Sequence, residues 1–136
     1  MPYREIEHTA ECGFIAEAET LAGVFKDAAT ALFEVVTDTS KVEPAVERRV
    51  ELEAEDAAEL MHVWLEELHY MSETEHEFYG GFDLEVTETG LCATVRGEKI
   101  DPGKHEMRSE IKAVTYGDYY FRETKDGYET RVVVDV

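Results

Sequence analysis

The last residues of the chain bring two carboxylates close together. Asp135 follows three consecutive valines, 132–134, and precedes Val136, the final residue. A side-chain carboxylate beside an α-carboxylate places like charges within a few ångströms, which destabilises a fold unless something positive lies between them. Three arrangements resolve this: a lysine, a hard cation such as Ca²⁺ or Mg²⁺ with oxygen ligands, or a frayed, solvated terminus.

A second polar cluster lies near the start of the chain. Residues 8–13 read His-Thr-Ala-Glu-Cys-Gly and join two short alternating segments. Polar residues at such a junction usually serve a turn or a cap. From the residues alone we therefore interpret this cluster as turn chemistry.

The histidines do not form a metal motif. His62, His69 and His76 are spaced by seven. Seven residues are two helical turns, or about 10.5 Å along the axis, too far for one zinc ion. We interpret them as partly exposed helix histidines, with His76 where the helix ends, and His105 as a hydrogen-bonding loop residue.

The sequence lacks the common catalytic motifs. Gly80-Gly81 is not followed by Lys-Ser/Thr, so we predict a bulge or bend there rather than a phosphate loop. No serine lies in a Gly-x-Ser-x-Gly elbow. No nucleophile–base pair is evident, so we predict no catalytic residues and a protein that is not an enzyme.

Two segments have the periodicity of helices. Apolar residues recur at spacings of three and four over residues 20–38 and 56–72. Thr20 is the expected N-cap of the first, with one apolar stripe. Asp56 and Glu59 resemble a capping box at the start of the second.

The remaining segments read as strands. Their predicted ranges are 3–8, 12–19, 46–54, 82–88, 91–97, 112–123 and 128–134. Thr89-Gly90 and Lys125-Asp126-Gly127 have the composition of hairpin turns. The order predicts an α+β fold, a mixed or antiparallel sheet with two packed helices.

Composition narrows the class of protein. The 136 residues suit one domain, and 43% hydrophobic residues support a core. Thirty-two Asp and Glu against 13 Lys and Arg give a net charge of −19, which argues against direct binding to nucleic acid or anionic membranes. Expected partners are cations and basic protein surfaces.

The sequence also suggests the cellular compartment and the state of the two cysteines. We see neither a membrane span nor a signal peptide, and we expect a cytoplasmic protein. Cys12 and Cys92 lie far apart without a CxxC pattern. We expect buried, reduced thiols; a disulfide is the alternative, and a zinc site is disfavoured.

Several ordered motifs make the chain resemble the archease family along nearly its whole length, and we expect one archease-like domain over residues 1–136. The strongest is Ile111 to Tyr116, and the chain ends Val134-Asp135-Val136 where the family ends hydrophobic-Asp-Ile. The other shared motifs are His8-Thr9-Ala10-Glu11, Thr20-Leu21, Ala28-Ala29, Thr37-Asp38, Val42-Glu43-Pro44, Trp64-Leu65, Glu67-Leu68, Gly97 and Lys104-His105.

The resemblance implies both fold and function. Archeases have a strand-helix-strand-strand core with an inserted α+β element. They activate GTP-dependent tRNA-splicing RNA ligases of the RtcB family, promoting guanylylation of the ligase and multiple turnover. An alternative role is a chaperone-like modulator of a tRNA cytosine-5 methyltransferase.

The resemblance also implies a metal site. Its ligands here are Glu11, Asp135 and Val136, with Ca²⁺ as the expected ion and Mg²⁺ or Mn²⁺ as alternatives. The family usually has Asp where Glu11 stands, and the longer side chain suits Ca²⁺ better than the stricter octahedron of Mg²⁺. Lys112 and His8 are the residues expected to act in ligase activation, with a structural ion pair as the alternative role of Lys112.

Overall fold

The computed structural model describes the backbone of residues 3–8 and 11–136, and the side chains of residues 3, 4 and 11–136. The first elements are strands β1 (Tyr3–His8) and β2 (Glu11–Ala18), helix α1 (Leu21–Val36) and a short 3₁₀ turn, η1 (Thr39–Lys41). Strand β3 (Val46–Glu53) and helix α2 (Ala57–Glu75) precede strands β4 (Glu77–Val86) and β5 (Gly90–Lys99). The chain finishes with β6 (Ala113–Val114), β7 (Tyr120–Thr124) and β8 (Gly127–Asp135).

The strands form two antiparallel sheets. The five-stranded sheet has the order β1-β2-β8-β6, and β7 pairs with the earlier part of β8. The three-stranded sheet has the order β3-β5-β4. The α+β class is confirmed, and the strands that the sequence analysis assigned to one sheet divide between two. The second sheet and α2 together are one continuous insertion between α1 and β6.

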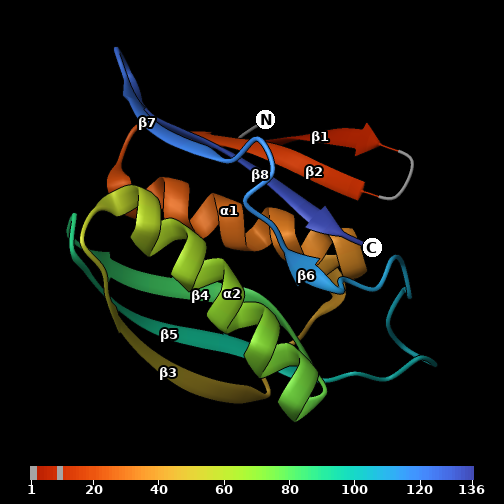
Figure 1. Ribbon diagram of the computed structural model, residues 1–136. Coiled ribbons are helices and arrows are strands. Elements are labelled where there is room, and N and C mark those ends of the chain that lie inside the picture. Colours follow the sequence, from red (N-terminus) through yellow and green to blue (C-terminus); the bar gives the residue numbers. More distant parts are fainter. Residues whose placement is uncertain (1–2, 9–10) are drawn as a thin grey trace.

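The helices lie between the two sheets (Figure 1). Helix α1 contacts β2 on one side and β4 on the other. Its buried residues therefore exceed one stripe: they are Val24, Phe25, Ala28, Ala29, Ala31, Leu32 and Phe33. A helix covered on two sides must be apolar over most of its circumference. The predicted single stripe was too narrow because sequence periodicity did not reveal the second sheet.

Both helices begin at the predicted caps. The Thr20 hydroxyl accepts a hydrogen bond from the Gly23 N–H at 3.0 Å. The Asp56 carboxylate accepts one from the Glu59 N–H at 2.8 Å. Helix α2 continues one turn beyond the predicted end, and His76 closes it in the left-handed conformation, with φ 55°. Neither helix of the described chain combines the length and apolarity needed to cross a membrane.

Most predicted strands lie close to observed strands, but one predicted strand is interrupted in the structure. The register of β4 shifts between Tyr79 and Gly81, so the predicted bulge at Gly80-Gly81 is confirmed. The single strand predicted over 112–123 was wrong, since β6 and β7 are separated by a turn. In that turn Asp118 has φ 52°, and the Tyr119 N–H donates to the Tyr116 carbonyl.

Both cysteines are free thiols, as predicted, but they are half-buried rather than fully buried. The Arg49 guanidinium donates to the Cys92 sulfur at 3.2 Å.

An ion pair between Arg48 and the buried Glu77 connects two strands of the insertion. Glu77 is 0% exposed and accepts two hydrogen bonds from Arg48, at 3.1 and 2.8 Å, and one from the Tyr79 hydroxyl at 2.7 Å. Hydrogen bonding to Arg48 lowers the pKa of Glu77 below its ordinary value. The pair ties β3 to the start of β4; Arg48 also contacts Glu75 at 3.2 Å, and the Lys99 ammonium lies 3.7 Å from Glu77.

Residues 100–112 have no helix or strand and run from β5 to β6; we call them the strap. Backbone bonds hold the strap to the end of α1: the Arg108 N–H donates to the Val36 carbonyl and the Ser109 N–H to the Val35 carbonyl. His105, as predicted, is a hydrogen-bonding loop residue: its Nδ1 accepts from the Asp101 N–H.

Glu98, near the end of β5, secures the first part of the strap. It accepts hydrogen bonds from the Glu43 N–H at 2.7 Å, the Lys104 ammonium at 2.9 Å and the His105 ring at 3.0 Å. These donors, the Glu43 N–H first, lower the pKa of Glu98 to about 2.

Gly97→Ala should strongly destabilise the protein. A Cβ at Gly97 would collide with the Phe78 carbonyl oxygen and lie 2.8 Å from the Tyr79 Cα, both backbone atoms that cannot turn away. We expect a loss of about 3 kcal/mol in the free energy of unfolding, measured by urea titration of Trp64 fluorescence. Gly81→Ala is the matched control, because its nearest neighbour would be 3.5 Å away. Equal stability of the two variants would contradict the packing described for this strand pair.

Glu98 predicts a dependence of stability on acid. Its pKa falls from 4.5 to about 2 on folding, so its contribution is complete above about pH 4.5 and is lost as the pH falls towards 2. Glu98→Gln should lower the urea midpoint at pH 6, and this gap should narrow at pH 3. Glu85→Gln, at an exposed position of β4, is the control and should show no such gap. A gap of the same size at both pH values would disprove the role of Glu98.

Candidate functional site

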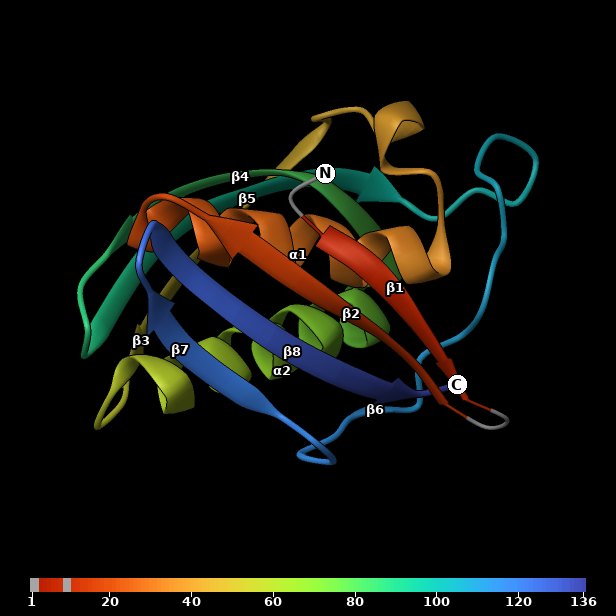
Figure 2. The same ribbon diagram turned by 90° about the horizontal axis from the view of Figure 1, so that it is seen from above.

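Residues from the first two strands and from the end of the chain meet in one row across the five-stranded sheet. In the pairing of β2 with β8, Glu11 is the register partner of Asp135. His8 of β1 is paired with Glu11, and Ala113 of β6 with Asp135. Figure 2 shows the end of β8 close to the end of β1 and the start of β2, with β6 on its other side. We call Glu11, Asp135 and Val136 the terminal acidic site.

The register places the two carboxylates on the same face of the sheet. Partners in an antiparallel pair project to one side, with Cβ atoms about 4.5–5.5 Å apart. Phe14 and Val134 point towards the helices and are buried, so alternation sends Asp135 and its partner Glu11 to the opposite face. Both side chains are half-buried there. The structure thus brings together two residues that are 124 positions apart in the sequence.

The terminus is ordered rather than frayed. Asp135 is a residue of β8, and its carbonyl accepts a hydrogen bond from the Lys112 N–H at 2.7 Å. Val136 is partly buried against the core. The interpretation of a frayed, solvated end is therefore wrong, and the charges of this row stay together.

A lysine does not neutralise the row within the described residues. The Lys112 side chain is exposed, and neither Glu11 nor Asp135 appears in an ion pair with a described residue. Lys112 itself likewise forms no ion pair among them. The backbone N–H of Lys112 bonds to the Asp135 carbonyl and so attaches the end of the strap to β8.

Part of the predicted motif lies outside the described residues. The backbone of His8 belongs to β1, whereas its side chain and residues 9 and 10 are not described. Among the residues that are described, no three His, Cys, Asp or Glu side chains gather in a metal-binding arrangement. The predicted set has two such side chains, Glu11 and Asp135, and takes its third donor from the main chain at Val136.

His62 and His69 hold the segment that borders this site. The His69 Nε2 contacts the Ile111 carbonyl at 2.8 Å, and the His62 Nε2 contacts the Thr115 carbonyl at 2.8 Å. Two histidines that lie two turns apart on α2 thereby hold two carbonyls that are four positions apart in the chain. The segment from Ile111 to Thr115, with Lys112 inside it, is fixed at both ends.

His62 contradicts the interpretation of partly exposed histidines. It is 0% exposed, its Nδ1 lies 2.9 Å from the Glu66 carboxylate, and its ring stacks on Tyr116 with centroids 3.6 Å apart. Burial follows from the turn after β6, which folds Tyr116 back over α2. The spacing of seven, which excludes a shared metal ion, places His62 and His69 two turns apart on α2, where each contacts a backbone carbonyl.

Comparisons with known proteins agree with the fold and with the resemblance to the archease family. A model of the Archease protein family matches residues 3–136. The chain is 37% identical to the protein archease of Methanopyrus kandleri over 140 residues, covering 100% of both chains. It is 41% identical to that of Methanothermobacter thermautotrophicus over 132 residues, covering 94% of each.

Two solved structures resemble the fold over nearly the whole chain. The solution structure of Methanobacterium thermoautotrophicum protein 1598 superposes with a TM-score of 0.88 at 38% identity, over 99% of both chains. A crystal structure from Thermotoga maritima, described as an archease and possible chaperone, gives 0.70 at 20% identity, over 98% of this chain and 96% of that one. That second likeness concerns the fold alone.

A family match over residues 3–136 and full-length relatives at 37% and 41% identity lead to one conclusion: the chain belongs to the archease family.

Proposed function

We propose that the protein activates a GTP-dependent tRNA-splicing RNA ligase of the RtcB type through a divalent cation held at the terminal acidic site. The observation that carries the proposal is the register of β2 with β8, which sets Glu11 directly opposite Asp135. Membership of the archease family supports the choice of partner. The protein acts as an activator, and the ligase performs the chemistry.

The donor set fits a hard divalent cation. Glu11, Asp135 and the carboxylate of Val136 offer oxygen donors alone, the ligands that Ca²⁺, Mg²⁺ and Mn²⁺ prefer. Like charges directly opposite in a sheet repel one another. Since no described residue pairs with either side-chain carboxylate, a bound cation would relieve that repulsion. The longer side chain of Glu11 favours Ca²⁺, whose coordination is more flexible.

Each residue of the site has a separate task in this proposal. Glu11, Asp135 and Val136 hold the cation at the edge of the molecule, and a divalent cation there would stabilise negative charge during guanylyl transfer. Lys112 presents an exposed ammonium beside the site while its N–H fixes Asp135. His8 occupies the next position of the row.

The net charge of −19 supports a basic protein partner. An active-site cleft that holds RNA is positive, and such a surface attracts an acidic protein over distances of about a Debye length. The charge that disfavours direct RNA binding thereby speeds encounter with an RNA-binding enzyme.

A chaperone-like role, with a tRNA methyltransferase as partner, is the alternative. The Thermotoga maritima relative is described as a possible chaperone. Proteins that hold unfolded chains present large apolar patches. Among the described residues only Tyr70, Met107 and Tyr116 are exposed large hydrophobic side chains. This scarcity favours the ligase proposal.

Asp135→Asn tests the proposal, because it removes one negative oxygen donor while preserving the size of the side chain. We expect Ca²⁺ binding, measured by calorimetry, to weaken by about tenfold or more. Formation of the guanylated ligase in the presence of the variant should fall to nearly the rate of the ligase alone. Asp126→Asn, in the exposed β7–β8 turn, is the matched control. Full activation by a folded Asp135→Asn protein would reject the cation mechanism, whereas failure of the unsubstituted protein to activate the ligase would favour the chaperone-like role.

His69→Leu should loosen the strap end without touching a proposed ligand. Loss of the bond to the Ile111 carbonyl costs about 1 kcal/mol, so local opening should increase roughly fivefold. Hydrogen exchange at the Lys112 amide should accelerate by that factor, and ligase activation should weaken. Tyr70→Phe, at the next and exposed position of α2, is the control. An unchanged exchange rate at Lys112 would show that His69 does not hold this segment.

A further inference from the structure

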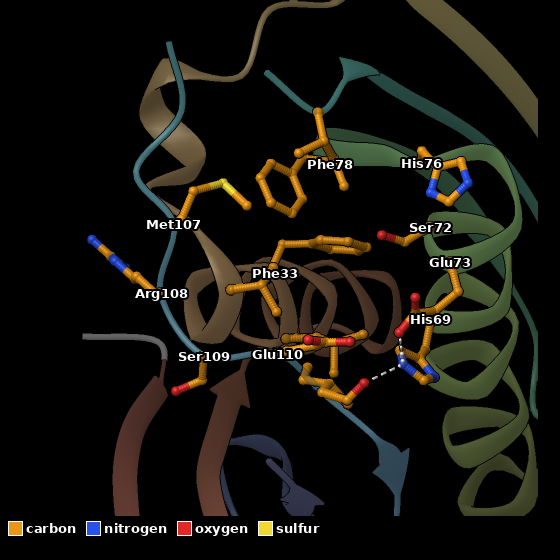
Figure 3. A pocket seen from close by; sticks show the side chains of 14 residues that line it. Phe33, His69, Ser72, Glu73, His76, Phe78, Met107, Arg108, Ser109 and Glu110 are labelled. Atoms are coloured by element: carbon orange, nitrogen blue, oxygen red, sulfur yellow. Dashed lines mark hydrogen bonds and ion pairs between the residues drawn. The ribbon is translucent and has the colours of Figure 1, made fainter. Parts of the chain in front are cut away.

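A cavity opens between α1, α2, the start of β4 and the strap (Figure 3). Its volume is about 280 Å³. Apolar side chains line most of it: Leu32, Phe33, Val36, Phe78, Ile100 and Ile111. Figure 3 shows Phe33 in the middle of this lining, with Phe78 beside it. Met107 of the strap, 53% exposed, lies at the mouth.

The size and lining suit one bulky apolar group. A dry cavity of about 150 Å³ lined by Leu, Ile and Phe accommodates benzene. At 280 Å³ this cavity has room for a whole aromatic or leucine side chain with part of its backbone. It opens to solvent, so such a group can enter from outside.

The mouth of the cavity is acidic. Glu73 of α2 and Glu110 of the strap are both exposed there. Glu73 lies 3.3 Å from the His69 ring, and Glu110 has no ion pair within the described chain. The cation at the mouth, Arg108, is already bonded to Glu34 and Glu106. An entering segment would therefore meet two carboxylates with capacity for Lys or Arg.

The cavity adjoins the terminal acidic site. Ile111 lines the cavity, and the next residue, Lys112, donates its N–H to the Asp135 carbonyl. His69 contacts both the cavity and the Ile111 carbonyl. A partner segment bound in the cavity would therefore contact Ile111. The next residue, Lys112, is bonded to Asp135 of the terminal acidic site.

We propose that the cavity is a docking socket for one bulky apolar side chain from a basic segment of the partner protein, with Lys or Arg on either side of it. The proposal rests on the proposed function, since the partner it takes is the RNA ligase. A second copy of this chain is the wrong occupant, because two proteins of charge −19 repel each other. The ligase uses the socket for attachment, and the terminal acidic site for activation.

Methyl NMR tests occupancy of the socket directly. The chain has four isoleucines, and Ile100 and Ile111 line the cavity, whereas Ile15 lies on β2 outside it. In protein labelled at Ile methyl groups and bound to the deuterated, Leu/Val/aromatic-protonated cognate ligase, we expect intermolecular NOEs to Ile100 and Ile111. Ile15 should show none. A complex without NOEs to Ile100 and Ile111 would overturn the socket.

Charge reversal tests the rim. The double variant Glu73→Lys, Glu110→Lys should bind the ligase about tenfold more weakly at low salt, chiefly through slower association. Glu85→Lys, Glu88→Lys makes the same change in net charge at exposed positions near the β4–β5 turn and is the matched control. If both double variants weaken ligase binding equally, the effect depends on net charge alone. The proposed contact of Glu73 and Glu110 with the ligase would then be wrong.

The two proposals fail in different ways. If the ligase binds with the expected NOEs but Asp135→Asn still activates it, the socket stands and the cation mechanism falls. If Asp135→Asn abolishes activation but the NOEs are absent, the ligase docks elsewhere. If the ligase does not bind the protein at all, both proposals are rejected.

Discussion

The pairing of β2 with β8 is the constraint on which the rest of the molecule depends. One face of the pair carries Phe14, Ala16, Val132 and Val134, all buried under the helices. Each large side chain among them contributes about 1.5–3 kcal/mol on burial, against about 0.2–1 kcal/mol for repulsion between opposed like charges. A slip of one residue would turn the apolar face outwards. Burial on one face therefore forces Glu11 and Asp135 together on the other.

The insertion adds a second sheet, so the helices lie between two sheets (Figure 1). By placing β3, β4 and β5 on the far side of α1, it gives that helix a second apolar partner, and the Arg48–Glu77 pair ties the insertion together. The same insertion supplies α2, whose histidines hold Ile111 and Thr115. The insertion thus positions the strap that borders the terminal acidic site, although it contributes no predicted ligand.

Local signals in the sequence predicted local structure well. Thr20 and Asp56 cap the helices, Gly80-Gly81 forms a bulge and Gly127 takes φ 155° in the last turn, because each depends on neighbours within a few residues. The second sheet, the break between β6 and β7 and the burial of His62 depend on contacts across tens of residues. The row that joins Glu11 to Asp135 was of this second kind, and the family resemblance, not the residue chemistry, suggested it in advance.

The central place of β8 also determines when the molecule can be completed during synthesis. The β1–β2 hairpin leaves the ribosome early, yet its neighbour in the sheet is the last strand in sequence order. The insertion is contiguous in the chain, so its sheet and its helix can form before β8 has been synthesised. Completing the five-stranded sheet pairs β2 with β8, whose residues are more than a hundred positions apart. Such long-range pairing is a slow step in folding. The acidic row is therefore assembled last, and a truncated chain would lack it altogether.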